Sequence, residues 1–273
     1  MEVLFCLDFS PRYFCKLLTF KYLPMAKQTG LFNFEGTLDN VTFYRTADGL
    51  LVRKKGGVSR RRLLNDPNFI RARENAAEFG SCAKSAGKLR KSVSLMVHKA
   101  KDSKLSSRLI KVFHEIKTYD SINGRGERTV AQGLTTVAGK LLLKGFDFNK
   151  NAKWQSILPV PYALDLLTGT VTISNLNPVE LLNYPEGATH FSLQSALLHI
   201  DLTSGDSEIY YSDLDNYPIT NSIINPSLAP SDVPTLIGTK FFLVLIEFFQ
   251  EVNGSQSRLN NGAFNALSIL EVL

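Results

Sequence analysis

The chain has 273 residues, of which 44% are hydrophobic and 10% aromatic, and its formal charge at pH 7 is +6. This is the composition of a globular protein that can bury a sizeable core. A membrane-spanning helix is excluded, because no apolar run approaches roughly 18 residues and the best one, residues 241–249, is interrupted by Glu247. The cysteines form no CxxC pair and no disulfide framework, so we expect a reducing, cytoplasmic location. They are Cys6, Cys15 and Cys82.

Charge is divided unevenly along the chain. Residues 25–144 carry 24 Lys and Arg against 10 Asp and Glu, a net charge of +14, whereas residues 145–273 carry 4 against 13, a net charge of −9. Such asymmetry predicts either a half that binds polyanions or two halves that neutralise each other. We therefore expect a basic region over residues 25–144 and an acidic domain over residues 145–273.

The first 24 residues are apolar and aromatic but carry charges throughout. They lack the uninterrupted apolar centre and the small-residue cleavage site of a signal peptide. Residues 25–28, Met-Ala-Lys-Gln, are typical of a bacterial start. We therefore expect Met25 to be the true start and residues 1–24 to be a mis-assigned extension.

Residues 30–55 show a strand-like pattern. Three short apolar runs are separated by Asp39-Asn40 and Asp48-Gly49, and Asp-Gly between apolar runs is a strong hairpin signal. The first run is Leu31, Phe32 and Phe34, and the pattern predicts a three-strand meander. The basic segment that follows is either a phosphate-contacting loop or a solvated connector. Its basic residues are Arg53, Lys54, Lys55, Arg60, Arg61 and Arg62.

The stretch 66–91 predicts a helix. Asp66 is a candidate N-cap and Pro67 suits the first turn, although Gly80 and Gly87 each weaken a helix by about 1 kcal/mol relative to alanine. Residues at alternating three- and four-residue steps place one alanine-rich face against a neighbour. That face consists of Phe69, Ala72, Ala76, Phe79, Ala83 and Ala86.

Helical patterning continues in three further segments, which brings the number of expected helices to about four. Their apolar stripes are Leu89, Val93, Val97 and Ala100, then Leu105, Leu109, Val112 and Ile116, then Val130, Leu134, Val137 and Leu141 within residues 127–143. Two outer faces carry basic residues at a spacing that either follows a phosphate backbone or keeps an ordinary helix surface solvated. These residues are Lys84, Lys88, Lys91, Lys104, Arg108 and Lys111.

Beyond residue 145 the pattern changes to short strands. Hairpins are indicated around Thr168-Gly169 and at residues 204–206, and the clearest strand pair is 240–252 with 264–273. The proline-rich residues 217–235 predict an extended surface loop. Strands without intervening helices favour an antiparallel sandwich. The predicted fold is α+β: an N-terminal three-strand meander and about four helices, then an antiparallel immunoglobulin-like β-sandwich.

No motif meets the requirements of an enzyme site. Residues 80–88, GSCAKSAGK, fail as a phosphate-binding loop because Cys82 occupies the first glycine position and Leu89 replaces the final Ser or Thr. Cys82 is interpreted as a small packing residue rather than a reactive thiol. The histidines are too dispersed for a metal site, with pairing of the last two across a hairpin left open. They are His98, His114, His190 and His199. We predict no enzyme activity, no cofactor and no metal.

Short motifs are spread along the chain from Met25 onward. They are Gly30, Gly36, Val41-Thr42-Phe43-Tyr44, residues 53–58, Asp66-Pro67, Phe69, Arg73-Glu74-Asn75 and Glu78-Phe79-Gly80, followed by Gly145-Phe146, Phe148-Asn149, Pro185, Gly187-Ala188-Thr189 and Phe191. Together they resemble the signature of an uncharacterised bacterial protein family. The resemblance implies no activity, cofactor or binding residue. Residues 1–24 depart from the family pattern, in agreement with a start at Met25.

Two functions follow from these observations. The first is a non-catalytic structural or interaction protein, in which the β domain presents loops to a protein partner or a second copy and the basic helices contact an acidic counterpart. The alternative is a nucleic-acid-binding protein that uses the basic residues of the N-terminal half. Aromatic residues are sparse among those basic positions, which disfavours recognition of single strands by stacking. Exposure of the basic surface, as opposed to its burial under the acidic half, would distinguish the two.

Overall fold

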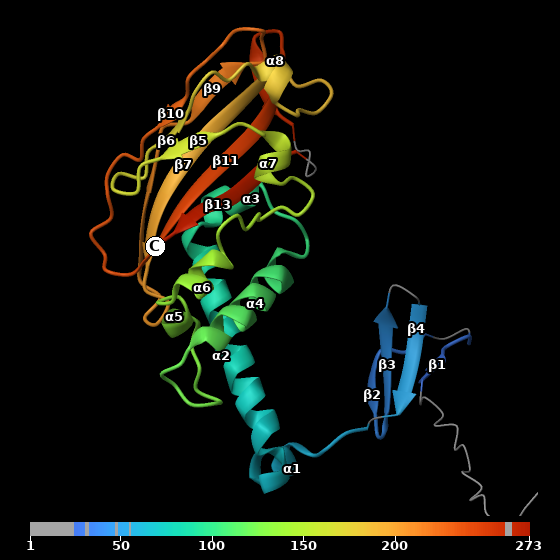
Figure 1. Cartoon of the computed structure of the whole chain (residues 1–273). Coiled ribbons are helices and arrows are strands. Elements are labelled where there is room, and N and C mark those ends of the chain that lie inside the picture. The colour runs from blue at the N-terminus through green and yellow to red at the C-terminus, as the bar shows by residue number, and fades with distance from the viewer. Residues whose placement is uncertain (1–24, 31–32, 47–48, 55, 260–263) are drawn as a thin grey trace, which may run out of the picture. The chain divides into compact units, whose positions relative to one another are not determined.

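The structure is a computed structural model that describes residues 25–30, 33–46, 49–54, 56–259 and 264–273 (Figure 1). The predictions about residues 1–24 lie outside the described residues. Contacts divide the chain into an N-terminal unit that ends at Leu63 and a C-terminal unit that begins at Leu64. The boundary expected near residue 145 falls inside the C-terminal unit.

The N-terminal unit contains a four-stranded antiparallel sheet in the order β1-β4-β3-β2. Its strands are β1 Met25–Lys27, β2 Gly36–Leu38, β3 Val41–Thr46 and β4 Gly49–Lys54. The predicted meander is confirmed as β2-β3-β4, with Asp39 in the left-handed region (φ 49°) at the first turn. The first strand of the meander begins at Gly36, later than predicted. Leu31, Phe32 and Asp48 lie outside the described residues, and the short helix α1 Arg60–Asn65 follows the sheet.

The helices of the C-terminal unit confirm most of the predicted segments. They are η1 Pro67–Phe69, α2 Ile70–Ser92, α3 Ser94–Lys99, α4 Leu105–Ile116, η2 Lys117–Tyr119, α5 Val130–Gly133, α6 Val137–Leu141, α7 Trp154–Ile157 and α8 Pro178–Leu181. Asp66 caps the first turn as expected, because its carboxylate accepts a hydrogen bond from the N–H of Asn68 (2.9 Å).

The buried face of α2 lies one residue away from the predicted face. Ala72 and Ala76 are exposed, and Phe79 retains 54% of its accessible surface. The buried residues are Glu78, Cys82, Ser85, Ala86 and Leu89. The prediction failed because alanine has the highest helix propensity on either face, so its presence does not mark the buried one. The first turns of α2 also project from the rest of the C-terminal unit (Figure 1), so the described residues of that unit leave the predicted face exposed there.

The single helix predicted over residues 127–143 is wrong, since two short helices replace it. Thr129 caps α5 by accepting from the N–H of Gln132, and Thr136 caps α6 by accepting from the N–H of Gly139. Val137 and Leu141 are exposed, although the prediction placed both in the apolar seam.

Two long antiparallel strands, β7 His190–Ile200 and β11 Thr239–Val252, form the centre of a six-stranded sheet. The outer edge of β7 pairs with β8 Ser207–Tyr211 and β9 Asp215–Pro218. The outer edge of β11 pairs with β12 Ser255–Arg258 and β13 Ala266–Val272. A smaller sheet, in the order β10-β6-β5, consists of β5 Tyr162–Leu164, β6 Val171–Ile173 and β10 Ser227–Leu228.

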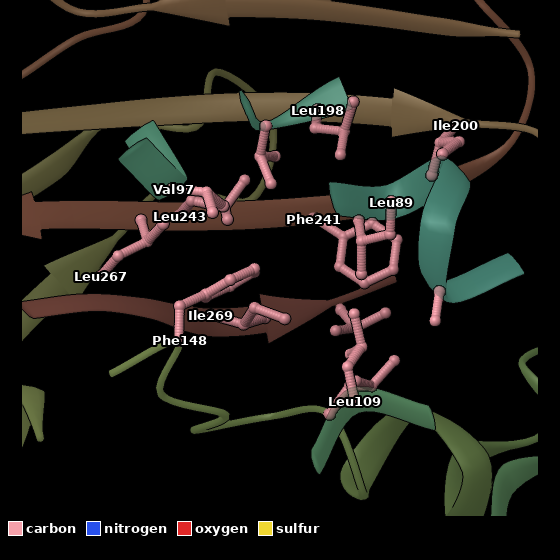
Figure 2. Packing of buried hydrophobic residues seen from close by; sticks show 14 of the residues in the cluster. Leu89, Val97, Leu109, Phe148, Leu198, Ile200, Phe241, Leu243, Leu267 and Ile269 are labelled. Atoms are coloured by element: carbon pink, nitrogen blue, oxygen red, sulfur yellow. The ribbon is translucent and has the colours of Figure 1, made fainter. Parts of the chain in front are cut away.

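Each face of β11 contributes to a separate core. Phe241 and Leu243 point toward the helices, where they pack with residues of α2 and α4 such as Leu89 and Leu109 (Figure 2). Leu245 belongs to the same core. The alternate residues of β11 pack with the smaller sheet. The mixed α and β content and the antiparallel pairing are therefore confirmed. The prediction of strands without intervening helices is wrong, because α7 and α8 lie beyond residue 145. The proline-rich residues 217–235 are not wholly a loop either, since they contain β10, which pairs with β6. The immunoglobulin-like topology is not confirmed and stays a prediction.

Candidate anion-binding surface

A hollow of about 480 Å³ lies where the second half of α2, α3 and the first turn of α4 meet. We call it the α2–α4 hollow. Its polar lining consists of Arg90, Lys91, Ser94, His98, Lys101, Asp102, Ser103 and Ser106. The lining therefore carries three permanent cations, one carboxylate, a histidine and three hydroxyl groups.

The apolar pattern of the sequence positions this lining. Helix α2 ends at Ser92, Val93 adopts a non-helical conformation (φ −102°, ψ 21°), and α3 starts immediately afterwards. Leu89 and Val93 before the bend and Val97 after it all remain in the helical core. The polar residues between them are consequently turned outward on both sides of the bend.

Arg90 is the residue that joins the two walls of the hollow. One terminal nitrogen, Nη1, donates a hydrogen bond to the hydroxyl of Ser106 (2.6 Å) in the first turn of α4. Its Nε–H has no hydrogen-bond partner among the described residues. The guanidinium is thus fixed at the hollow while part of its donor capacity stays unused.

Asp102 is the only carboxylate of the lining, and its charge is already engaged. Burial raises the pKa of Asp102, but the N–H groups of Lys150 and Lys104 and the guanidinium of Arg108 outweigh that effect and lower it. The ion pair with Arg108 measures 2.5 Å. Because the charge of Asp102 is already paired with Arg108, the lining of the hollow keeps a net positive charge.

The structure separates the predicted basic residues of α2 and α4 into two groups. Lys88 and Arg108 hold the fold: Lys88 Nζ donates to the carbonyls of Leu202 (2.9 Å) and Thr203 (2.6 Å). Arg108 donates to the carbonyls of residues 147 and 148 as well as to Asp102. The other four are exposed, and they are Lys84, Lys91, Lys104 and Lys111. Of these six predicted residues only Lys91 lines the α2–α4 hollow.

The basic segment before α2 belongs to the N-terminal unit and is not assigned to the hollow. Arg53 lies over the ring of Tyr44, 5.3 Å from its centroid, and is exposed. Lys54 is exposed as well, and Lys55 lies outside the described residues. The exposed basic residues of α1 are Arg60, Arg61 and Arg62.

The sequence prediction missed three members of the lining, Arg90, His98 and Lys101. A signal was present, since residues 98–104 contain four basic or imidazole side chains next to the predicted end of a helix. Arg90 lies off the predicted basic face of α2, and the bend at Val93 and the loop after α3 take His98 and Lys101 out of its helical spacing.

The acidic half does not neutralise the basic surface. Within the described parts of the chain, two ion pairs connect residues 25–144 with residues 145–273: Lys99 with Glu247 (2.9 Å) and Lys144 with Glu271 (2.5 Å). Glu247 is fully buried, so its pair belongs to the interior. The two halves are joined mainly by the apolar core, and the exposed lysines keep their charge.

The described residues contain few features that point to other chemistry. No three His, Cys, Asp or Glu side chains among them are placed to hold a metal ion, and none of their helices is long and apolar enough to cross a membrane. Cys82 is fully buried, its thiol lies 3.6 Å from the carbonyl of Phe113, and burial raises its pKa to about 11. A thiol of that pKa stays protonated at neutral pH, in agreement with a packing role.

Comparison of the chain with models of protein families, with curated proteins and with solved structures gave no match. Among the described residues, the α2–α4 hollow and the exposed lysines of α2 and α4 carry positive charge that is open to a ligand.

Proposed function

We propose that the protein is a non-catalytic nucleic-acid-binding protein that holds a phosphate backbone against α2, α3 and α4. The observation that carries this proposal is the exposure of the basic surface beside an acidic half that leaves it uncovered. The surface consists of the α2–α4 hollow together with Lys84, Lys104 and Lys111. Lysine and arginine bind phosphate backbones through charge and without regard to sequence.

The spacing of the exposed lysines supports contact with an extended anion. Lys84 and Lys91 are seven residues apart on α2, and Lys104 and Lys111 are seven apart on either side of the first turns of α4. Seven residues of helix span roughly 10 Å, so each row reaches more than one phosphate. Lys91 of the first row lines the hollow, and Arg90 connects α2 with α4 there.

Fluorescence anisotropy tests the proposal. Single- and double-stranded DNA and RNA of 20 nucleotides are titrated with the protein at salt concentrations between 50 and 200 mM. We expect the logarithm of the binding constant to fall linearly with the logarithm of salt, with a slope of about −0.9 per contact on duplex DNA and about −0.7 on a single strand. Lys91→Glu should weaken binding and flatten the slope. Lys240→Glu, an equal charge change on β11, should leave both nearly unchanged. Absence of binding at 50 mM salt would overturn the proposal.

A second function, binding of an acidic protein partner, is favoured by one observation. Next to the basic surface, Phe79 of α2 and Ile110 of α4 line a mainly apolar hollow of about 420 Å³ together with Lys111 and His114. An acidic amphipathic helix fits such a surface. In that case the β part, with the proposed immunoglobulin-like topology, serves as the scaffold of an interaction protein. Binding of an acidic amphipathic peptide that excess nucleic acid does not displace would support this function over the first.

A further inference from the structure

A second hollow, of about 530 Å³, lies next to the proposed surface and involves the acidic half of the chain. We call it the 108–153 hollow. Four of its lining residues are cationic: Arg108, Lys144, Lys150 and Lys153. The two hollows meet at one ion pair, because Asp102 lines the first and its partner Arg108 lines the second.

The walls of the 108–153 hollow are fixed by backbone pairing. Gly145 adopts a positive φ of 74° after α6 and directs the chain along the free edge of β13. The N–H of Gly145 donates to the carbonyl of Ile269, and the N–H of Phe148 donates to the carbonyl of Leu267, both at 2.8 Å. Phe148 is buried in the helical core. The segment between Lys144 and Lys150 is therefore held along β13 by backbone hydrogen bonds and an isolated bridge between Asp147 and Ser268, with Phe148 as its anchored side chain.

Arg108 holds this segment to α4. Its guanidinium donates to the carbonyls of Asp147 (2.8 Å) and Phe148 (2.9 Å) and lies over the ring of Phe146 at 5.2 Å. The N–H of Lys150 in turn donates to Asp102 at 2.8 Å. One ion pair thus fixes a wall of each hollow.

The charges of the lining are not equally available. Arg108 is paired with Asp102, and Lys144 is paired with Glu271. Lys150 and Lys153 are exposed, and neither forms an ion pair with another described residue. Asp147 is the one carboxylate of the lining, and it accepts a hydrogen bond from the N–H of Trp154 (3.0 Å). Burial raises the pKa of Asp147, and the nearby positive charges of Lys153 and Arg108 favour its ionised form against that effect. The available charge therefore comes from Lys150 and Lys153.

We propose that the 108–153 hollow binds phosphate through Lys150 and Lys153, and that it holds the phosphates of a nucleic-acid strand beyond those held at the α2–α4 hollow. The second part of this inference rests on the proposed function. The 108–153 hollow would extend the binding surface from the basic helices onto the acidic half, which has a net negative charge but contains Lys150 and Lys153.

The double variant Lys150→Gln/Lys153→Gln tests the inference. Loss of two phosphate contacts should reduce the log–log salt slope by about 1.4 to 1.8 and weaken binding of a 20-mer roughly 25- to 60-fold at 0.1 M salt. Lys27→Gln/Lys240→Gln removes two positive charges outside both hollows and should have little effect. Because Lys150 and Lys153 are exposed, an unchanged urea midpoint should show that the variant is folded. A double variant with wild-type affinity and slope would overturn the inference and leave the proposed function standing.

A titration of the wild type with inorganic phosphate, followed by amide NMR, separates the hollow from the nucleic acid. Saturable shifts at Gly145, Lys150 and Lys153 that disappear in the double variant would establish a phosphate site. If the wild type binds no 20-mer, the proposed function fails, and this titration alone decides whether the hollow binds phosphate. Absence of shifts at these residues together with an unchanged salt slope would exclude the site.

Discussion

Glu78 and Lys117 form an ion pair between α2 and η2 in which both side chains are almost completely removed from water. Glu78 also accepts a hydrogen bond from the N–H of Gly126 (2.8 Å). Burial lowers the pKa of Lys117, and the nearby Arg128 and Arg125 lower it further. Each member of the pair therefore depends on the other to remain charged inside the protein.

We expect Lys117→Met to destabilise the protein by about 3 to 5 kcal/mol, because it leaves the Glu78 carboxylate buried without a counter-charge. The double variant Glu78→Leu/Lys117→Met should recover most of the loss, since it removes the orphaned charge as well. Urea unfolding of the three proteins measures both effects. Equal instability of the single and double variants would show that packing, and not the uncompensated charge, sets the cost.

Asp120 organises the loop between η2 and α5. Its carboxylate accepts hydrogen bonds from the N–H groups of Ile122 (3.0 Å), Asn123 (2.9 Å) and Thr129 (2.8 Å). Burial by itself raises the pKa of Asp120, but these donors outweigh it and bring the pKa down to about 2. The folded state thus favours the ionised carboxylate.

A depressed carboxyl pKa stabilises the folded state above the unfolded pKa of about 4 and loses that contribution as the pH falls toward 2. Asp120→Asn should therefore cost about 1 to 2 kcal/mol at neutral pH, after allowance for solvent screening, and progressively less between pH 4 and pH 2. The difference in unfolding free energy between wild type and variant, measured across this range, checks the prediction. A difference independent of pH would show that the carboxylate charge is not responsible.

At the scale of single elements, glycines in helices differ according to their neighbours. A Cβ on Gly133 in α5 would collide with the carbonyl of Ile116, whereas a Cβ on Gly80 in α2 meets nothing within 4 Å. Gly133→Ala should lower stability by about 1 to 3 kcal/mol through overpacking. Gly80→Ala should raise stability by up to about 1 kcal/mol, because alanine favours the helix. Thermal unfolding of both variants should give shifts of opposite sign, and a stabilised Gly133→Ala would contradict the close approach of α5 to α4.

The elements that the sequence predicted well are those whose signal is local. Thr168-Gly169 joins β5 to β6 as expected, because glycine at a positive φ permits the turn wherever the hairpin lies. The long apolar runs likewise became β7 and β11. The face of α2 could not be read in the same way, because burial of Glu78 depends on Lys117, 39 residues later.

The candidate site was predictable only in part, for the same reason. Lys91 follows from helical spacing, but Arg90 became part of the site through Ser106, and Lys150 through Asp102. Those contacts bring together residues far apart in the sequence. Lys150 and Lys153 also lie in the half with a net charge of −9, so the sequence around them does not read as a basic segment.

At the scale of the whole molecule, one helical core contains residues from both sides of residue 145. Nearly half of its described members come from the β part, including Phe241, Leu243 and Ile269 on β11 and β13 (Figure 2). Each large apolar side chain contributes about 1.5 to 3 kcal/mol on burial, and a domain is stable by only about 5 to 15 kcal/mol. The helices therefore cannot remain folded once these strands are withdrawn, although their charge sets them apart.

This dependence predicts a single unfolding transition for the C-terminal unit. Trp154, the only tryptophan of the chain, is buried in the core between the two sheets and reports on the β part. Far-UV circular dichroism at 222 nm reports chiefly on the long helices α2 and α4, which lie in the other core. In urea the two signals should change together, with one midpoint and one slope. Two separate midpoints would show that the basic helices and the acidic strands fold independently, as the division of charge near residue 145 suggests.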